Sequence, residues 1–459
     1  MNTKLHLDDT NKKRLQALGT EPVGRLLFRF AMPAIVGMAA ASLYNIVDAI
    51  FIGQFVGTEA INALAIAMPL MVLAAAVGML VGVGASTLMS VRLGQKDYAA
   101  ANKILGNVLI FKFIGGILVT IPSLLFLDPL LHFFGASEHT LPYARDFMQI
   151  ILLFNITSHA YYGLNTLMRS LGKPMTAMWF TISTVVLNIV LAALFIIAFG
   201  WGVRGAAAAT VLSQIIMLAF QLYLLSNKAE PVHFRREGFQ LDRKILTDAL
   251  AIGMSPFLIH VCACLVVILI NNTLVAHGGD TAVGAYGISN RLLYLIITIV
   301  IGINQGMQPI AGYNYGAKNI DRLLIVLKHA MLAGTAITTL GFVCFHLFPE
   351  RLAAAFTDDI TLIAMSAHAL SSISWSYPIV GAQLVATTFF QCIGYVRQSI
   401  FLSLTRQLLF LVPLLLILPD FWGTDGVWYA MPLADILSCL VTSTLLLYHI
   451  RKFRTGLVS

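Results

Sequence analysis

Charged residues are scarce in this chain of 459 residues. Lys, Arg, Asp and Glu together account for 11% of the sequence, whereas 58% of the residues are hydrophobic. Soluble proteins carry about 25% charged residues, so this composition excludes an ordinary soluble fold. The mean hydropathy of +0.84 over the whole length means that apolar segments dominate throughout. The sequence therefore predicts a polytopic membrane protein.

Signatures of catalysis and of nucleotide use are missing as well. The sequence has no GxxxxGK[ST] pattern, so the chain cannot take energy from ATP through a P-loop of its own. No Ser/His/Asp order and no cluster of metal ligands occurs outside the apolar segments. We therefore expect a protein that is not an enzyme and that needs no cofactor.

The few cysteines all fall inside apolar segments, at Cys262, Cys264, Cys344, Cys392 and Cys439. Buried membrane cysteines usually act as small hydrophobic residues. Their odd number and their positions indicate neither a disulfide framework nor a zinc site. No apolar run precedes Phe28, so we also expect no cleavable secretory signal.

Twelve apolar runs are long enough to cross a bilayer, which takes about 20 residues per helix. Turn signals such as Gly278-Gly279 and Asp425-Gly426 separate them. The sequence thus predicts an all-α protein with twelve transmembrane helices, near residues 28–52, 61–90, 104–126, 144–168, 175–199, 203–225, 247–273, 283–308, 323–347, 366–390, 396–418 and 426–449.

The net charge of +8 is distributed in a way that favours a membrane topology over nucleic-acid binding. If the N-terminus is inside, the inside segments hold every lysine and arginine except Arg145, Arg204, Arg291 and Arg351. This count places Lys112 with the inside charges around the loop between the second and third spans, and Arg406 with those between the tenth and eleventh. The asymmetry predicts that both termini are cytoplasmic.

The second half of the chain repeats the first. A shift of 222 residues aligns Ala60 with Ala282, Gly84 with Gly306 and Gly172 with Gly394, and a shift of 221 aligns Trp201 with Trp422. A nearly constant offset across helices and loops indicates an internal duplication. We expect two six-helix lobes related by a pseudo-two-fold axis along the membrane normal, with a cavity between them.

This duplication predicts how the chain divides into domains. The expected segments are a cytoplasmic tail over residues 1–24, an N-terminal lobe over 25–226, a cytoplasmic linker over 227–246, a C-terminal lobe over 247–450 and a cytoplasmic tail over 451–459.

The first span, residues 28–53, carries one carboxylate, that of Asp48. A charge within a membrane helix costs a few kcal/mol or more, so it needs a partner or a task. Tyr44 and Asn45 precede Asp48 by four and three residues, on the same helix face, and Pro33 can bend the helix. We interpret Asp48 as a cation or proton site and Pro33 as a hinge beside it. The alternative is that Asp48 is close enough to the helix end to be hydrated at the interface.

The second lobe carries its own intramembrane charges, Arg291 in the eighth span and Asp435 in the twelfth. Both lie roughly 12–14 Å from the outer helix ends by helix rise. Equal depth predicts an ion pair, which either locks the lobe or leaves Asp435 open to competition by substrate or a proton. His260 in the seventh span is either a proton relay or a hydrogen-bonded membrane histidine.

These features together resemble a known family. The motif LYNIVDAIFIG in the first span, the loops RLGQKDYAAANK and NYGAKNIDR, and QGMQPIAGYNYGAK after the eighth span are similar to the multidrug and toxic compound extrusion (MATE) transporters. NIVLAALFI in the fifth span and GAAAATVLSQ in the sixth fit the same family. The resemblance runs from about Gly24 to Ile450 and is greatest to the MepA-like and DinF-like bacterial branch.

The resemblance implies a function. Members of the family export bulky, often cationic organic compounds in exchange for H⁺ or Na⁺, by alternating access. It implies a monomeric, multi-pass protein of the bacterial inner membrane, with drugs and the lipid bilayer as partners. A lipid-linked oligosaccharide flippase of the same superfamily and a major-facilitator transporter are the rival readings. Extra spans, a strongly basic cavity or a major-facilitator loop motif would favour them, and the sequence has none of these.

The resemblance also implies residue roles. Pro33 would lie in a bending first span, and Asp48 would belong to an ion or proton site with Asn188 and Thr210 as polar partners. These three side chains can meet only if the first, fifth and sixth spans converge. Many relatives carry an aspartate where this chain has Ala192, and often Gln or Glu where it has His260. A single carboxylate should hold Na⁺ less well, so we expect proton coupling, with Na⁺ at Asp48, Asn188 and Thr210 as the alternative.

Overall fold

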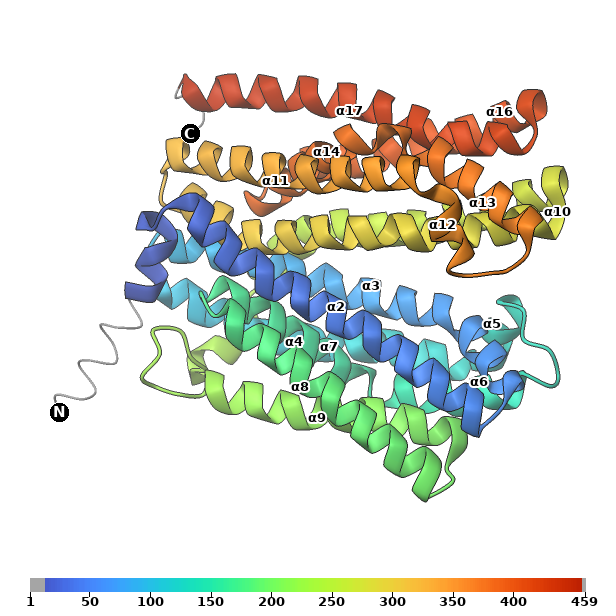
Figure 1. The fold of residues 1–459 in the computed structure, drawn as a ribbon. Coiled ribbons are helices and arrows are strands. Elements are labelled where there is room, and N and C mark those ends of the chain that lie inside the picture. Colours follow the sequence, from blue (N-terminus) through green and yellow to red (C-terminus); the bar gives the residue numbers. More distant parts are fainter. Residues whose placement is uncertain (1–12, 456–459) are drawn as a thin grey trace. The chain divides into compact units, whose positions relative to one another are not determined.

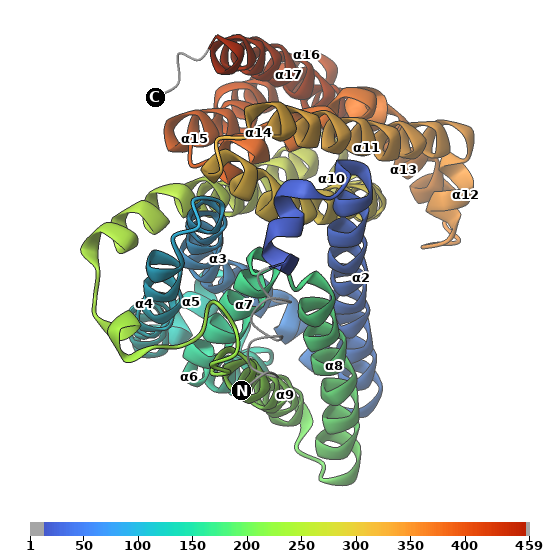
Figure 2. The ribbon, with the colours of Figure 1, turned by 90° about the vertical axis from the view of Figure 1, so that its left-hand side faces the viewer.

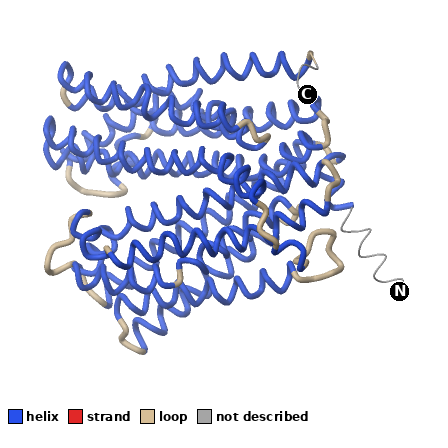
Figure 3. Tube along the Cα trace, turned by 180° about the vertical axis from the view of Figure 1, so that it is seen from behind, coloured by secondary structure: helices blue, strands red, loops and turns tan. Residues whose placement is uncertain are grey.

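The computed structural model describes residues 13–455, and every regular element among them is a helix (Figure 3). The chain separates into two compact units. The first unit comprises the described residues up to Glu21 together with Val36–Phe257, and the second comprises Pro22–Ile35 and the described residues from Leu258 onward. Figure 1 labels the helices of both units.

The first unit begins with a short helix over residues 13–20. It continues with most of α2 (Val23–Phe55), α3 (Thr58–Gly94), α4 (Tyr98–Leu125), α5 (Leu127–Phe133), α6 (Leu141–Leu153), α7 (Asn155–Ser170), α8 (Pro174–Ala192), the π-helix η1 (Ala193–Ala198), α9 (Gly202–Leu225) and the 3₁₀ turn η2 (Arg236–Phe239).

The second unit holds the start of α2 and most of α10 (Arg243–Gly316). It continues with α11 (Ile320–Leu347), α12 (Pro349–Ala354), α13 (Ile360–Ile373), the 3₁₀ turn η3 (Ser374–Ser376), α14 (Tyr377–Cys392), α15 (Val396–Leu404), the π-helix η4 (Thr405–Leu411), α16 (Val412–Trp422) and α17 (Thr424–Arg454).

These helices make up the twelve predicted spans. Among the described residues, nine helices are long and apolar enough to cross a membrane, and one of them, α10, is divided into two spans at the non-helical Gly279. Two further spans are interrupted helices, α6 and α7 meeting at Phe154, and α13 and α14 joined by η3. Phe154 and Ser376 are 222 residues apart, so both repeats interrupt their fourth span at the same place.

Two helices pass from one compact unit to the other. The boundary in α2 falls between residues 35 and 36, two residues after Pro33, and the boundary in α10 falls between residues 257 and 258, next to Pro256. The sequence assigned the whole first span to the N-terminal lobe, whereas the compact units divide it. Proline removes one backbone hydrogen bond from each helix close to the crossing.

Two glycines at equivalent positions of the repeats explain why the start of α2 belongs to the second unit and the start of α10 to the first. In the second unit, a Cβ on Gly306 of α10 would lie 2.6 Å from the backbone nitrogen of Ala31, at the start of α2. In the first unit, a Cβ on Gly84 of α3 would lie 1.9 Å from the carbonyl oxygen of Ala249, at the start of α10. Both contacts require glycine, because any side chain would overlap the neighbouring backbone. The first span of each repeat therefore begins against the second span of the other repeat.

The predicted linker is docked along α4 within the first unit, where it appears as the yellow-green segment beside that helix (Figure 2). The buried Asn107 side chain donates to the carbonyls of Gly238 (3.0 Å) and Gln240 (2.9 Å) and accepts from the backbone N–H of Asp242 (2.8 Å). Asn102 likewise accepts from the N–H of His233 (2.8 Å). These bonds replace the water that would otherwise solvate the linker backbone.

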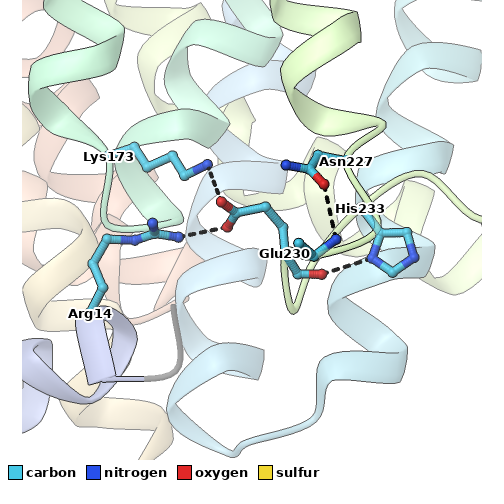
Figure 4. Close-up of polar contacts among 6 residues, drawn as sticks. Arg14, Lys173, Asn227, Glu230 and His233 are labelled. Atoms are coloured by element: carbon cyan, nitrogen blue, oxygen red, sulfur yellow. Dashed lines mark hydrogen bonds and ion pairs between the residues drawn. The ribbon is translucent and has the colours of Figure 1, made fainter. Parts of the chain in front are cut away.

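An ion-pair cluster fastens the same linker to the N-terminal helix (Figure 4). The Glu230 carboxylate accepts from Arg14 Nη2 and from Lys173 Nζ, each at 2.8 Å. Burial acts to raise the pKa of Glu230, but the hydrogen bonds and charges of Lys173 and Arg14 outweigh it, so the pKa lies below its ordinary value. Burial also lowers the pKa of Lys173, against the opposing effect of Glu230.

Candidate functional site

The predicted residues of the first unit come together where α2 meets α8 and α9, two helices that pack side by side (Figure 1). Asp48 of α2 is 6% exposed, so its carboxylate is buried and the alternative of a hydrated side chain at the helix end does not apply. Asn188 of α8 and Thr210 of α9 are buried as well. The expected convergence of the first, fifth and sixth spans is therefore present.

Hydrogen bonds connect three of these side chains in a defined direction. The Thr210 hydroxyl donates to the carbonyl of Ala206, its neighbour one turn earlier, at 3.1 Å. A threonine hydroxyl has one proton and two lone pairs, so Thr210 must accept its other two bonds. These come from Asn188 Nδ2 at 3.2 Å and from the Tyr44 hydroxyl at 2.9 Å. The Tyr44 proton is thus directed at Thr210.

Asp48 lies beside this chain of donors and interacts electrostatically with Tyr44. Its Oδ1 atom and the Oδ1 atom of Asn188 are both buried and have no hydrogen-bond partner among the described residues. Buried oxygen atoms without a donor are costly. A proton on Asp48 would give its carboxyl group a hydrogen-bond donor. Carboxylate and amide oxygens are also the kind of ligand that a small hard cation takes.

Three further positions that the sequence connected with this site are Asn45, Pro33 and Ala192. The backbone of Asn45 belongs to α2, but its side chain lies outside the described residues. Pro33 lies inside α2, in the part that belongs to the second unit. Ala192 is fully buried at the end of α8, in an apolar cluster that includes Ile52 and Ala206. Asp48 is therefore the one carboxylate among the predicted residues of this site.

The predicted ion pair of the second unit is wrong in one partner. Asp435 of α17 is paired with Arg406 Nε, and Ser376 Oγ donates to its other oxygen at 2.8 Å. Arg291 is exposed, on the same side of α10 as the exposed Tyr294 and Leu295, and makes no ion pair with any described residue. Equal depth in the membrane does not determine which way a side chain points, and the exposed Arg291 does not point toward Asp435.

Two of the charges that the sequence counted with the inside loops lie within helices of the predicted spans. Arg406 belongs to η4, the π-helical part of the eleventh span. Lys112 is 2% exposed in α4, where its ammonium group donates to the Gly78 carbonyl and its side chain runs past Gly82 and Gly163. Lys112 lies inside the predicted span of residues 104–126, so its position along the chain indicates a charge within that span. It is counted with the inside loop because a positive charge near a span end usually lies at the cytoplasmic side.

His260 is half-buried in α10 and makes no hydrogen bond to any residue between 13 and 455. It is not joined to Asp435, whose partners are Arg406 and Ser376. Its assignment to a proton relay therefore stays a prediction.

Comparison with known proteins gives consistent results. The MatE family model matches residues 33–194 and 256–417, once in each repeat, and the two stretches begin at Pro33 and Pro256. The multidrug export protein MepA of Staphylococcus aureus (strain MSSA476) is 26% identical over 431 residues, which cover 94% of this chain and 94% of that protein.

Solved structures agree over almost the whole chain. The outward-facing conformation of a multidrug resistance MATE family transporter of the MOP superfamily matches with a TM-score of 0.90 and 25% identity, covering 96% of this chain and 98% of that one. A crystal structure of MATE in the bent conformation matches with a TM-score of 0.92 and 25% identity, covering 97% and 99%. The predicted twelve-helix architecture is thereby confirmed.

Proposed function

We propose that this chain, which belongs to the MatE family of membrane transporters, is a secondary active multidrug efflux transporter. It would export bulky, often cationic organic compounds in exchange for H⁺ or Na⁺ by alternating access. The proposal places the protein in the bacterial inner membrane as a monomer with both termini in the cytoplasm. The relative of similar length named as a multidrug export protein supports the substrate class.

The buried carboxylate of Asp48 beside the donor chain from Tyr44 to Thr210 is the observation that carries this proposal. When Asp48 is protonated, its O–H can donate to Tyr44, whose own proton stays on Thr210. When Asp48 is ionised, it becomes an acceptor only, and the Tyr44 proton is drawn toward it. Thr210 then loses a donor. Protonation of one carboxyl group therefore changes how α2 is bonded to α9.

This exchange would reach the rest of the first span through Pro33. The outer part of α2 carries Tyr44 and Asp48 within the first unit, while the part that contains Pro33 belongs to the second unit. A proline in the helix lowers the cost of bending there. We expect α2 to bend differently when Tyr44 donates to Thr210 and when it donates to Asp48. The two bends would correspond to the inward-open and outward-open states of the transporter.

Sodium is the alternative coupling ion. Asp48, Asn188, Thr210 and Tyr44 would supply its oxygen ligands, and Na⁺ would bring a positive charge to the carboxylate without a proton. Ala192 leaves the site with a single negative charge, which weakens electrostatic attraction for a metal cation but does not hinder protonation. We therefore favour H⁺ as the coupling ion.

Transport by purified protein in proteoliposomes, with pH and Na⁺ gradients imposed separately, tests the proposal. We expect an outward-directed flux of an organic cation such as ethidium under the pH gradient, and its loss in Asp48→Asn. Asp358→Asn, which removes an exposed acid, is the matched control and should transport normally. Unchanged gradient-driven efflux by Asp48→Asn would contradict the mechanism, and flux under the Na⁺ gradient alone would identify Na⁺ instead.

A further inference from the structure

A cavity in the first unit lies where α3 ends and where α4 and α10 begin. Its volume of about 320 Å³ is at the lower end of the range of small-molecule sites, about 300–1,000 Å³. Because it lies at the ends of apolar helices, the cavity is at the level of the lipid headgroups in a bilayer. Three basic and three acidic side chains line it, namely Arg92, Lys103, Lys244, Asp97, Asp242 and Asp248.

The opposite charges of this cavity are held apart. None of its three basic side chains forms an ion pair with a carboxylate of the described residues. Lys103 and Lys244 are exposed, and their ammonium groups make no hydrogen bond within the described chain. Arg92 donates one N–H to Gln95 at 3.1 Å. Charges of both signs that surround a space without pairing are complementary to a ligand that carries both signs.

Two of the three acids already have a structural task. Asp97 caps α4 by accepting from the N–H of Ala100 at 2.9 Å, and Asp242 caps α10 by accepting from the N–H of Lys244 at 2.9 Å. A carboxylate at this position is stabilised by the free N–H groups of its helix. Asp248 lies inside α10, is half-buried, and makes no hydrogen bond or ion pair with any residue from 13 to 455 through its carboxylate. It is therefore the acid available to a ligand.

The second repeat shows that the fold forms these helix ends without the charges. A shift of 222 residues places Asn319 at the position of Asp97 and Ile325 at the position of Lys103. Asn319 caps α11 by accepting from the N–H of Arg322 at 3.3 Å, as Asp97 caps α4. The capping contact is therefore kept with a neutral residue, and the lysine is replaced by an apolar one. Lys103 is an addition of the first repeat that the helix packing does not require.

We infer that this cavity binds the headgroup of a zwitterionic phospholipid, with its phosphate at Lys103 and Lys244 and its ammonium group at Asp248. A phosphate accepts charge-assisted hydrogen bonds from lysine, and a primary ammonium group has three N–H donors for a carboxylate. Phosphatidylethanolamine carries both groups. The glycerol end of the lipid would pack against the apolar part of the lining, which consists of Leu88, Ile104 and Ile245.

The inference goes beyond the proposed function, because lipid binding is measured without transport. Purified wild-type protein in detergent is titrated with phosphatidylethanolamine, phosphatidylcholine or glycerophosphoethanolamine, and native mass spectrometry measures the affinity for the first bound molecule. We expect phosphatidylethanolamine to bind about tenfold more tightly than phosphatidylcholine, whose quaternary ammonium group has no N–H for Asp248. Glycerophosphoethanolamine has the same headgroup without acyl chains and should bind more weakly than either lipid.

Variants at exposed positions identify the binding groups. Lys103→Gln/Lys244→Gln removes both phosphate contacts and should weaken the binding of phosphatidylethanolamine about tenfold or more. Lys228→Gln/Lys452→Gln removes the same charge at exposed lysines outside the cavity and should bind like wild type. Asp248→Asn should bind phosphatidylethanolamine and phosphatidylcholine equally, because the group that distinguishes their ammonium ends has lost its charge.

Three results would overturn the inference. One is equal affinity of wild type and Lys103→Gln/Lys244→Gln for phosphatidylethanolamine, and another is an equal loss in the control variant, which would leave only an effect of overall charge. The third is binding of glycerophosphoethanolamine as tight as that of the lipid, which would assign the cavity to a soluble compound. Failure of the proposed efflux activity would leave all of these measurements valid.

A measurement on wild-type protein does not depend on the folding of variants. A carbodiimide activates a carboxylate, and a primary amine in contact with it then forms an amide while the urea leaves. Mass spectrometry of the digested protein should find phosphatidylethanolamine joined to Asp248 several-fold more often than to Asp358, an exposed acid outside the cavity. Equal labelling of the two acids, or no labelling of Asp248, would exclude a headgroup site there.

Discussion

The hydroxyl oxygens of Tyr44 and Thr210 lie 2.9 Å apart, although the two residues are separated by 166 positions in the chain. Because the Thr210 proton is bound to Ala206, this contact has a direction, with Tyr44 as the donor. It joins the first span to the sixth beside a buried carboxyl group, and in the proposed mechanism its strength depends on the protonation of that group.

Tyr44→Phe removes this hydroxyl and keeps the ring. We expect gradient-driven efflux to fall several-fold, because Asp48 can no longer exchange a hydrogen bond with Thr210, while stability falls by about 1 kcal/mol. Efflux of ethidium and thermal unfolding of the purified protein measure the two effects. Tyr448→Phe, at an exposed tyrosine, is the control. A variant that keeps full efflux would show that the hydroxyl takes no part in coupling.

Pro33→Ala restores a backbone hydrogen bond to α2 at the place where the helix passes between the compact units. Alanine favours a straight helix, so the protein should fold normally and transport several-fold more slowly. Pro69→Ala changes a proline inside α3, a helix that stays within the first unit, and should leave transport unchanged. Comparing turnover of the two variants at equal protein amounts checks this, and equal turnover would contradict the hinge.

Asp435→Asn leaves Arg406 without its anion. We expect a loss of about 3 kcal/mol of stability and a reduced folded yield, because an unpaired charge within the helices is costly. Arg291→Gln should change stability by about 0.5 kcal/mol or less, since its side chain is exposed and unpaired with the described residues. Yields and thermal unfolding in detergent distinguish the two. A larger loss of stability in Arg291→Gln than in Asp435→Asn would instead support an ion pair between Arg291 and Asp435.

Glu230 should make the first unit sensitive to acid. Its pKa is lowered in the folded protein, so its contribution is present above the unfolded pKa and disappears as the pH falls through the folded value. Glu230→Gln should therefore be less stable than wild type by about 1 kcal/mol at pH 7, and the two should converge below the ordinary carboxyl range. Glu237→Gln, at an exposed neighbour, should follow wild type at every pH. Parallel curves for wild type and Glu230→Gln would exclude the ion-pair cluster.

Much of this architecture could be predicted from the sequence. Apolar length and turn residues predicted twelve spans, and a constant offset predicted the duplication, because hydrophobic runs and repeats are local or periodic properties. The meeting of Asp48, Asn188 and Thr210 was expected from the family resemblance, and the hydrogen bonds through Thr210 are consistent with it. The cost of a charge within a membrane helix singled out Asp48, but the sequence left open whether it is buried or hydrated at the helix end, and the structure shows it buried.

What the sequence determined by itself is therefore which segments lie in the membrane, since the transfer of a side chain from water depends on that side chain and its neighbours along the chain. Tertiary structure alone decided which charges face each other. The sequence predicts how deep a residue lies along a span, but not how the helix is rotated about its axis. Asp435 was therefore paired with Arg291 instead of Arg406. The same limit concealed Lys112, whose burial depends on glycines from two other helices.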